Sequence, residues 1–201
     1  MQQINQSLVK EIRQKFCNVE KCPISGDRIF FENAGGALTL RSALETSTKF
    51  AAIPDNQGRD NLTSNTLNSI IKNAKNDLSY LLNTHSGEFF MGESGTELLF
   101  RLIRNSLLAS PSGGSIVGTS LEHPASRSAA NKWADEMDYT YCSVPHNVEM
   151  GTVNPEAYAN HISETTRVVT IVHASPVTGM GTQIREISKI IRQKAPLAFI
   201  I

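Results

Sequence analysis

The second half of the chain alternates short apolar stretches with longer segments of helical spacing, and this pattern limits the possible folds more than any other. The apolar stretches are predicted strands at residues 88–91, 115–119, 139–144, 168–173 and 197–201. Between them lie the predicted helices 97–108, 125–137, 154–161 and 184–193. Strands that are apolar throughout and are joined by helices indicate a parallel sheet covered on both faces. We therefore expect an α/β fold of three layers, in which a mostly parallel sheet has helices on both faces.

The first half begins with an amphipathic segment, whose apolar residues recur every four positions as on one face of a helix: Ile4, Leu8, Ile12 and Phe16. Such a stripe must pack on something, so residues 1–27 are expected to form a helical arm and its connection. Residues 28–201 then form the main domain. A short strand at 29–31 and a long surface helix at 62–82 are expected within it.

Composition and charge exclude several classes of protein. Of the 201 residues 40% are hydrophobic and 19% charged, which is typical of a globular chain rather than a disordered or fibrous one. Lys plus Arg and Asp plus Glu both number 19, so the chain has no basic surplus for nucleic acid. No apolar window is long enough for a membrane span, and the start lacks a signal peptide. We expect a cytoplasmic protein without a nucleic-acid or membrane partner.

The segment Gly92–Glu97 (GESGTE) joins a predicted strand to a predicted helix. Backbone N–H groups at a helix start, beside small residues and the Thr96 hydroxyl, can hold a phosphate group. The alternative is a tight turn in which Ser94 or Thr96 caps the helix. The segment matches neither a P-loop nor a dinucleotide-binding fingerprint.

Two further loops carry polar groups after predicted strands. His123 follows the strand at 115–119, and Ser175 follows the strand at 168–173. A histidine there can transfer protons near neutral pH or lay its ring on a flat ligand, although a lone surface histidine is common. Because loops after parallel strands meet at one edge of the sheet, Thr96, His123 and Ser175 are expected to surround a planar, phosphorylated ligand.

The remaining histidines and the cysteines suggest structural roles. His173 is expected to be a hydrogen-bonded core residue, since it ends an apolar run. Cys17, Cys22 and Cys142 form no C-x-x-C pair and are expected to be free thiols of a cytosolic protein. No histidine lies at metal-ligand spacing from another histidine or a cysteine, so no metal site is expected.

The sequence ends within the apolar stretch 197–201. The carboxyl ends of strands are where open α/β sheets bind their ligands. We therefore expect this chain to be part of a longer protein.

Several motifs in chain order resemble those of the class V aminotransferase group of fold-type I pyridoxal-phosphate enzymes, which includes the cysteine desulfurases. The segments with this resemblance are FENAGG at 31–36, N-x-x-R at 56–59, SGTE at 94–97, EH at 122–123, TRVVTIVH at 166–173 with GMG at 179–181, and REI at 185–187. Together they cover roughly residues 28–201.

The resemblance implies a cofactor, pyridoxal 5′-phosphate, and roles for particular residues. Gly95 and Thr96 would hold its phosphate, and the catalytic His123 would stack on its ring and assist proton transfer. Pro176 stands where the desulfurases usually have an asparagine that touches the cofactor, so Ser175 or Thr178 is expected to substitute. The aspartate that pairs with the ring nitrogen and the Schiff-base lysine would lie beyond residue 201. Residues 28–201 would then be the N-terminal part of the cofactor-binding large domain.

The resemblance implies an enzyme that acts on an amino acid, of which this chain is the N-terminal half and inactive alone. A homodimer is expected for the whole protein. Two alternatives remain open. One is another class V chemistry, such as an epimerase or an aminotransferase. The other is a pseudo-enzyme or a binding domain that keeps the fold without catalysis.

Overall fold

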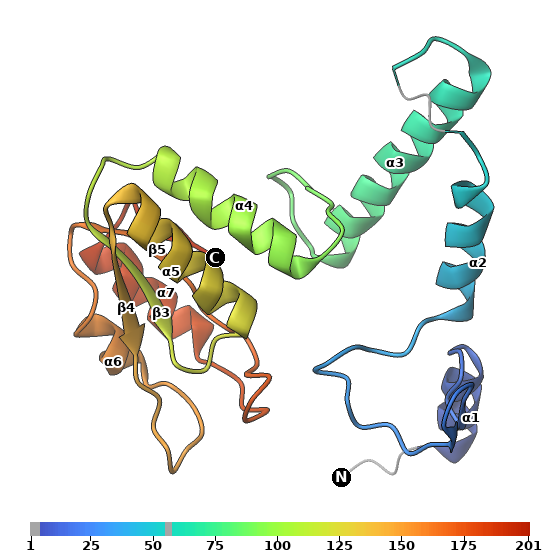
Figure 1. Cartoon of the computed structure of the whole chain (residues 1–201), viewed down its shortest axis with the longest axis horizontal. Helices are drawn as coiled ribbons and strands as arrows, with labels where there is room; N and C mark the ends of the chain where they lie inside the picture. Colours follow the sequence, from blue (N-terminus) through green and yellow to red (C-terminus); the bar gives the residue numbers. More distant parts are fainter. Residues whose placement is uncertain (1–4, 55–57) are drawn as a thin grey trace. The chain divides into compact units, whose positions relative to one another are not determined.

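A computed structural model describes residues 5–54 and 58–201, and the chain divides into two compact units, Met1–Phe89 and Phe90–Ile201 (Figure 1). Ile4 of the amphipathic stripe and Asn56 of the N-x-x-R motif lie outside the described residues. The predicted boundary between an arm at 1–27 and a domain at 28–201 stays a prediction.

The first unit is mainly helical. It contains α1 (Gln6–Gln14), α2 (Arg41–Ala51), α3 (Leu62–Leu81) and a hairpin of β1 (Lys21–Cys22) with β2 (Gly26–Asp27). Asn5 caps α1 and Asn61 caps α3, each accepting backbone N–H groups of the first turn. The end of α1 is joined to the start of α2, since the Arg41 N–H donates to the Lys15 carbonyl at 2.9 Å. The long helix predicted at 62–82 is confirmed.

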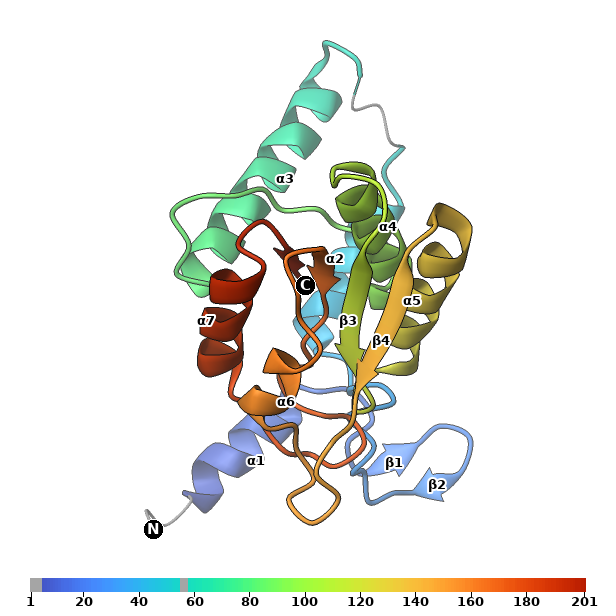
Figure 2. The ribbon, with the colours of Figure 1, turned by 90° about the vertical axis from the view of Figure 1, so that its left-hand side faces the viewer.

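The second unit contains a four-stranded parallel sheet. Its elements are α4 (Gly95–Leu108), β3 (Ser115–Thr119), α5 (Pro124–Met137), β4 (Thr140–Val144), α6 (Pro155–Ala159), β5 (Thr166–Val169), α7 (Ile184–Lys194) and β6 (Phe199–Ile200). The strand order is β4-β3-β5-β6, and all three pairings are parallel. Figure 2 shows α5 and α7 on opposite sides of the sheet. The predicted α/β fold with a parallel sheet is confirmed.

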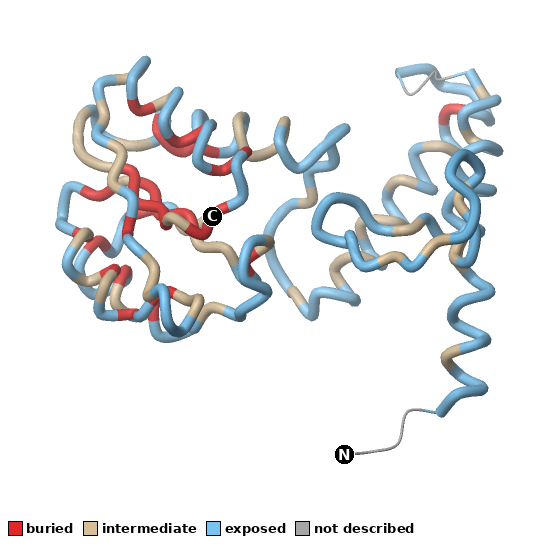
Figure 3. The backbone as a smooth tube through the Cα atoms, turned by 60° about the horizontal axis from the view of Figure 1, so that its bottom comes forward, coloured by how far each residue is buried: buried red, intermediate tan, exposed pale blue. Residues whose placement is uncertain are grey.

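Neighbouring residues of one strand face opposite helical layers, because side chains alternate along a strand. Ile116 and Val168 belong to a core cluster with residues of α4 and α5. Val117 and Val169 belong to a second cluster, which contains Tyr158 of α6 and residues of α7. The buried positions of this unit accordingly lie along the sheet and on the inner sides of its helices (Figure 3).

Two predicted strands are absent from the described chain. Residues 29–31 and 88–91 belong to no helix or strand. Phe31 is 90% exposed and Phe90 is 84% exposed. An apolar run becomes a strand only where another strand supplies hydrogen bonds. Apolar composition alone was therefore insufficient to predict a strand at either place.

None of the helices in the described parts of the chain has the length and apolar character needed to cross a membrane.

Candidate functional site

The connections after β3 and β5 leave the sheet in opposite directions. These strands are neighbours, but the helix that follows β3 is α5, on one face, and the helix that follows β5 is α7, on the other. In open α/β sheets, ligands bind at the carboxyl ends of the strands at such a switch point. His123 lies in the connection after β3, and Ser175 lies in the connection after β5. The sequence did not predict this switch point, because it does not give the strand order.

His123 is the N-cap residue of α5, and its side chain is exposed. Its Nδ1 accepts a hydrogen bond from the Ala125 N–H at 3.1 Å. An Nδ1 that accepts leaves the hydrogen of a neutral imidazole on Nε2. The ring is therefore held at one edge and keeps a donor available.

Gly95 and Thr96 form the first turn of α4, and both are exposed. Ser94 is the N-cap, and its Oγ accepts from the Glu97 N–H at 3.1 Å. A side chain added at Gly95 would meet no atom within 4 Å, so the approach to these N–H groups is open. The first N–H groups of a helix lack internal partners and favour an anion. The segment can therefore both cap the helix and bind a phosphate group, because Ser94 caps α4 and the N–H groups of Gly95 and Thr96 stay accessible.

The start of α4 lies at the same edge of the sheet as His123. α4 and α5 pack side by side and begin at the same end (Figure 1). They are joined by Trp133, whose Nε1–H donates to the Phe100 carbonyl at 2.9 Å and whose ring meets the Phe100 ring edge-on at 6.4 Å. This packing fixes the position of the first turn of α4, which contains Thr96, relative to the first turn of α5.

Ser175 is only 3% exposed and forms a turn. Its Oγ accepts from the N–H groups of Val177 and Thr178, both at 3.2 Å. The Thr178 hydroxyl donates to the Gly151 carbonyl at 2.7 Å, which fastens this turn to the loop after β4. The oxygen of Ser175 is therefore occupied by the turn, although its hydrogen remains available to donate. Contact of Ser175 with a cofactor stays a prediction.

His173 was predicted to be a core residue, but the structure shows it exposed. β5 ends at Val169, so the predicted strand 168–173 ends earlier and its last residues belong to the connection. A periodic apolar run does not reveal where a strand leaves its ladder.

Glu122 is a residue whose burial the sequence did not reveal. It is 4% exposed, although it follows β3 directly in front of His123. One carboxylate oxygen accepts from the Val172 N–H at 2.8 Å, and the other accepts from the Ser126 hydroxyl at 3.0 Å. The bond to Val172 joins the connection after β3 to the connection after β5. An acidic residue three positions after an apolar strand was the only signal of this in the sequence.

Burial raises the pKa of Glu122, although its hydrogen bonds and the nearby Arg127 act in the opposite direction. Burial likewise raises the pKa values of Tyr141 and Tyr158, and the nearby Glu122 carboxylate adds to both shifts. The carboxylate thus lies in a poorly solvated region, although the next residue, His123, is exposed.

The raised pKa of Glu122 predicts a pH dependence of stability. A carboxyl whose pKa is higher in the folded than in the unfolded chain contributes its full stabilisation of the fold below its ordinary pKa. This contribution is lost as the pH rises through the raised pKa of the folded chain. The neutral variant Glu122→Gln is therefore expected to gain stability relative to the wild type as the pH rises from about 4 to about 8. Denaturant unfolding of both proteins at several pH values measures this difference. A difference that does not change with pH contradicts the prediction.

Gly118 leaves space for two hydroxyl groups beside β3. A Cβ at this position would lie 2.7 Å from Thr170 Oγ1 and 2.9 Å from the Tyr141 hydroxyl oxygen. Thr170 is 2% exposed, and its Oγ1 has no hydrogen-bond partner within the described residues. Such a group favours a further polar partner at this edge of the sheet.

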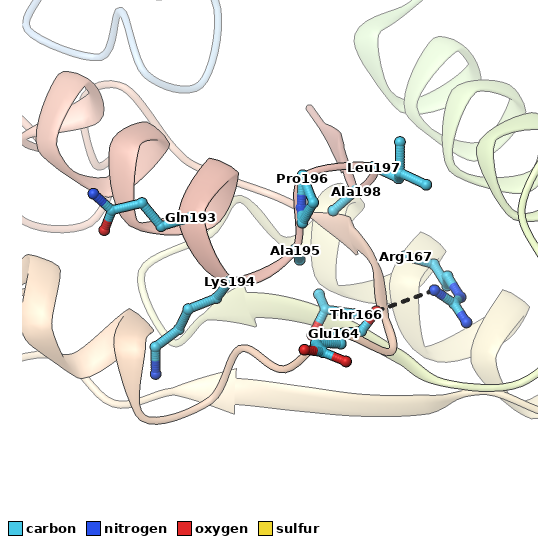
Figure 4. A pocket seen from close by; sticks show the side chains of 9 residues that line it. All are labelled: Glu164, Thr166, Arg167, Gln193, Lys194, Ala195, Pro196, Leu197 and Ala198. Carbon is cyan, nitrogen blue, oxygen red and sulfur yellow. Dashed lines mark hydrogen bonds between the residues drawn. The ribbon is translucent and has the colours of Figure 1, made fainter.

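A cleft at the other end of the strands contains none of the predicted site residues. Figure 4 shows it near the amino ends of β5 and β6, with Arg167 and Lys194 among its lining residues. Arg167 donates to the Glu164 carbonyl at 3.2 Å, and Lys194 donates to the Ala159 carbonyl. These cations are therefore already engaged with backbone oxygens. In residues 5–54 and 58–201, no group of three metal-ligating side chains is close enough to hold a metal ion.

Comparison with known proteins gives a family for most of the chain. Residues 29–200 match the family model described as aminotransferase class-V. The cysteine desulfurase-like protein ustD of Aspergillus flavus is 27% identical over 175 residues, which are 84% of this chain and 39% of that protein. This chain therefore spans well under half the length of that relative.

Solved structures share the fold at low sequence identity. A NifS-like protein superposes with a TM-score of 0.78 and 19% identity over 86% of this chain and 47% of that one. A C-DES mutant, which carries glycine covalently linked to its PLP cofactor, superposes with a TM-score of 0.72 and 19% identity. The superposition covers 94% of this chain and 47% of the C-DES chain.

Proposed function

The chain belongs to the class V aminotransferase family, and we propose that it is the N-terminal part of a PLP-dependent, cysteine desulfurase-like enzyme that acts on an amino acid. One observation carries this proposal. The exposed ring of His123 stands at the switch point between β3 and β5, at the edge where α4 begins with its open first turn. That edge combines a site for an anion with a flat, proton-transferring group.

The residues at this edge fit the proposed cofactor. The N–H groups at the start of α4 and the Thr96 hydroxyl would bind its phosphate, since a helix start favours an anion. His123, held through Nδ1, would lie on its ring and keep Nε2–H for proton transfer. The partnerless Thr170 hydroxyl offers a further polar contact. Bound pyridoxal phosphate supplies an electron sink for reactions at the α-carbon of amino acids.

The lysine that reacts with the cofactor is proposed to lie outside this sequence. The three lysines of the second unit are all engaged elsewhere: Lys132 with Glu136, Lys189 with Glu186, and Lys194 with the Ala159 carbonyl. That this chain covers 39% of its relative ustD is consistent with this assignment. The extent of the large domain from residue 28, the homodimer and the cytoplasmic location remain predictions of the same proposal.

A binding domain without catalysis is the second candidate. Pro176, at the position where the desulfurases usually have an asparagine, lies in the Ser175 turn and has no side-chain hydrogen-bonding group. This departure favours a site that holds the cofactor differently from a desulfurase.

The proposal predicts that the 201-residue chain binds pyridoxal phosphate weakly. Thr96→Ala and His123→Ala are each expected to raise the dissociation constant about tenfold, because each removes a contact worth about 1–2 kcal/mol. Calorimetric titration measures the constants. Thr63→Ala is a matched control, since Thr63 is the second residue of α3 as Thr96 is of α4, and His85→Ala is the control for His123→Ala. Equal losses in variants and controls, or a wild type that does not bind, would refute the proposal.

Reduction with borohydride tests the placement of the lysine in the same samples. We expect no stoichiometric covalent adduct on the chain, because binding through the phosphate and ring does not form a bond to a lysine. Mass spectrometry that finds one equivalent on a single lysine would place the reactive residue inside this sequence.

A further inference from the structure

The carboxylate of Glu122 connects the two sides of the switch point. Its hydrogen bond to the Val172 N–H joins residues 50 positions apart in the sequence. Its second hydrogen bond, from Ser126, reaches the first turn of α5. One side chain therefore contacts the helix that His123 caps and the segment that leads from β5 to Ser175.

The bond to Val172 continues the sheet where the ladder ends. The Thr170 N–H still donates to the Val117 carbonyl at 2.8 Å, as one more rung between β5 and β3. Two residues later, Val172 donates to the Glu122 side chain instead of to a strand. The carboxylate thus takes the place of a backbone acceptor at the point where the segments that follow β3 and β5 diverge.

A buried carboxylate is costly unless it is paired or hydrogen-bonded. Two hydrogen bonds compensate part of this cost, and a Gln side chain offers the same shape without the charge. A residue needed only for core packing would be apolar here. A buried carboxylate that is hydrogen-bonded to both divergent connections holds them at a fixed distance from each other.

We propose that Glu122 is a positioning residue that holds His123 at a fixed place relative to the connection after β5. The proposal rests on the proposed function, since the group that His123 serves is the ligand of this edge. Glu122 itself does not contact that ligand. It acts through the Val172 N–H on one side and the first turn of α5 on the other, so that the His123 ring keeps its Nδ1 contact with Ala125.

The test compares Glu122→Ala and Glu122→Gln in the 201-residue chain, and Ser126→Ala separates the effects of the two hydrogen bonds of Glu122. Nitrogen-15 NMR of the His123 imidazole reports which ring nitrogen carries the hydrogen, and amide exchange reports the Val172 N–H. In Glu122→Ala we expect a mixed tautomer at His123, loss of Val172 protection, and about tenfold weaker binding of pyridoxal phosphate. Glu122→Gln is expected to keep the wild-type tautomer and to bind within about twofold of the wild type.

Ser126→Ala removes the bond from the first turn of α5 to Glu122 and leaves the bond to Val172, so this variant is expected to keep the Val172 protection. If Glu122→Ala does not fold, Glu122→Asp makes the same comparison, because its shorter side chain cannot reach Val172. A folded variant without the Val172 bond that keeps the wild-type His123 tautomer overturns the inference. A wild type that does not bind pyridoxal phosphate refutes the proposed function alone, because the NMR comparison needs no ligand.

Discussion

Replacing Tyr158 by alanine is expected to lower the free energy of unfolding of the second unit by about 3–5 kcal/mol, as for other large aromatic residues in cores. Tyr158, from the short helix α6, is completely buried in the cluster between the sheet and α7. Removing the ring leaves a cavity among Val117, Val169 and Ile187, which cannot all move inward because two of them are fixed in strands. Denaturant unfolding followed by circular dichroism measures the loss.

Tyr158→Phe separates the ring from its hydroxyl group. The hydroxyl donates to the Thr170 carbonyl at 3.3 Å, a long bond, so its removal is expected to cost about 1 kcal/mol or less. Burial raises the pKa of Tyr158, so the side chain stays neutral and the difference in stability between the wild type and Tyr158→Phe should not change between about pH 5 and pH 9. Equal losses in Tyr158→Phe and Tyr158→Ala would mean that the hydrogen bond, and not the cavity, dominates.

Gly114→Ala is the second change with a large expected effect. Gly114 precedes β3 with a φ of 115°, and a Cβ there would overlap the Thr165 carbonyl oxygen, which is backbone and cannot swing away. The same residue starts the sheet, because its carbonyl accepts from the Thr140 N–H at 2.9 Å and the next N–H donates to Thr165 at 3.1 Å. The overlap therefore separates β3 from its neighbour β5. We expect a loss of more than about 3 kcal/mol, or failure to fold.

The neighbouring Gly113 provides the matched control. Its φ of 75° is also positive, but a Cβ there would meet no atom within 4 Å. Gly113→Ala thus has the backbone strain without the overlap, and about 1–2 kcal/mol is expected. Chemical unfolding of both variants measures the two losses, and similar values would show that strain alone governs this turn.

The sequence by itself determined the class of the fold and the order of the elements in residues 95–201. Runs such as SIVGT at 115–119 are apolar on both faces, and only a sheet covered on both sides accommodates them. The helix predicted at 125–137 is present as α5, which begins one residue earlier at Pro124, because proline lacks the N–H that a first helical residue does not need. The placement of His123 after β3 and Ser175 after β5 also followed from the local pattern.

Tertiary structure alone decided the strand order, the switch point and the burial of polar groups. β3 pairs with both β4 and β5, and this central place depends on hydrogen bonds between residues about 25 and 50 positions apart. For the same reason Phe31 and Phe90 stay exposed in runs that looked like strands, since no described strand pairs with them. Glu122 is buried and links the segments after β3 and β5, because Val172 lies beside it only after folding. Spacing along the chain records the preference of a segment, but the partner that satisfies its polar groups is chosen by packing between distant segments.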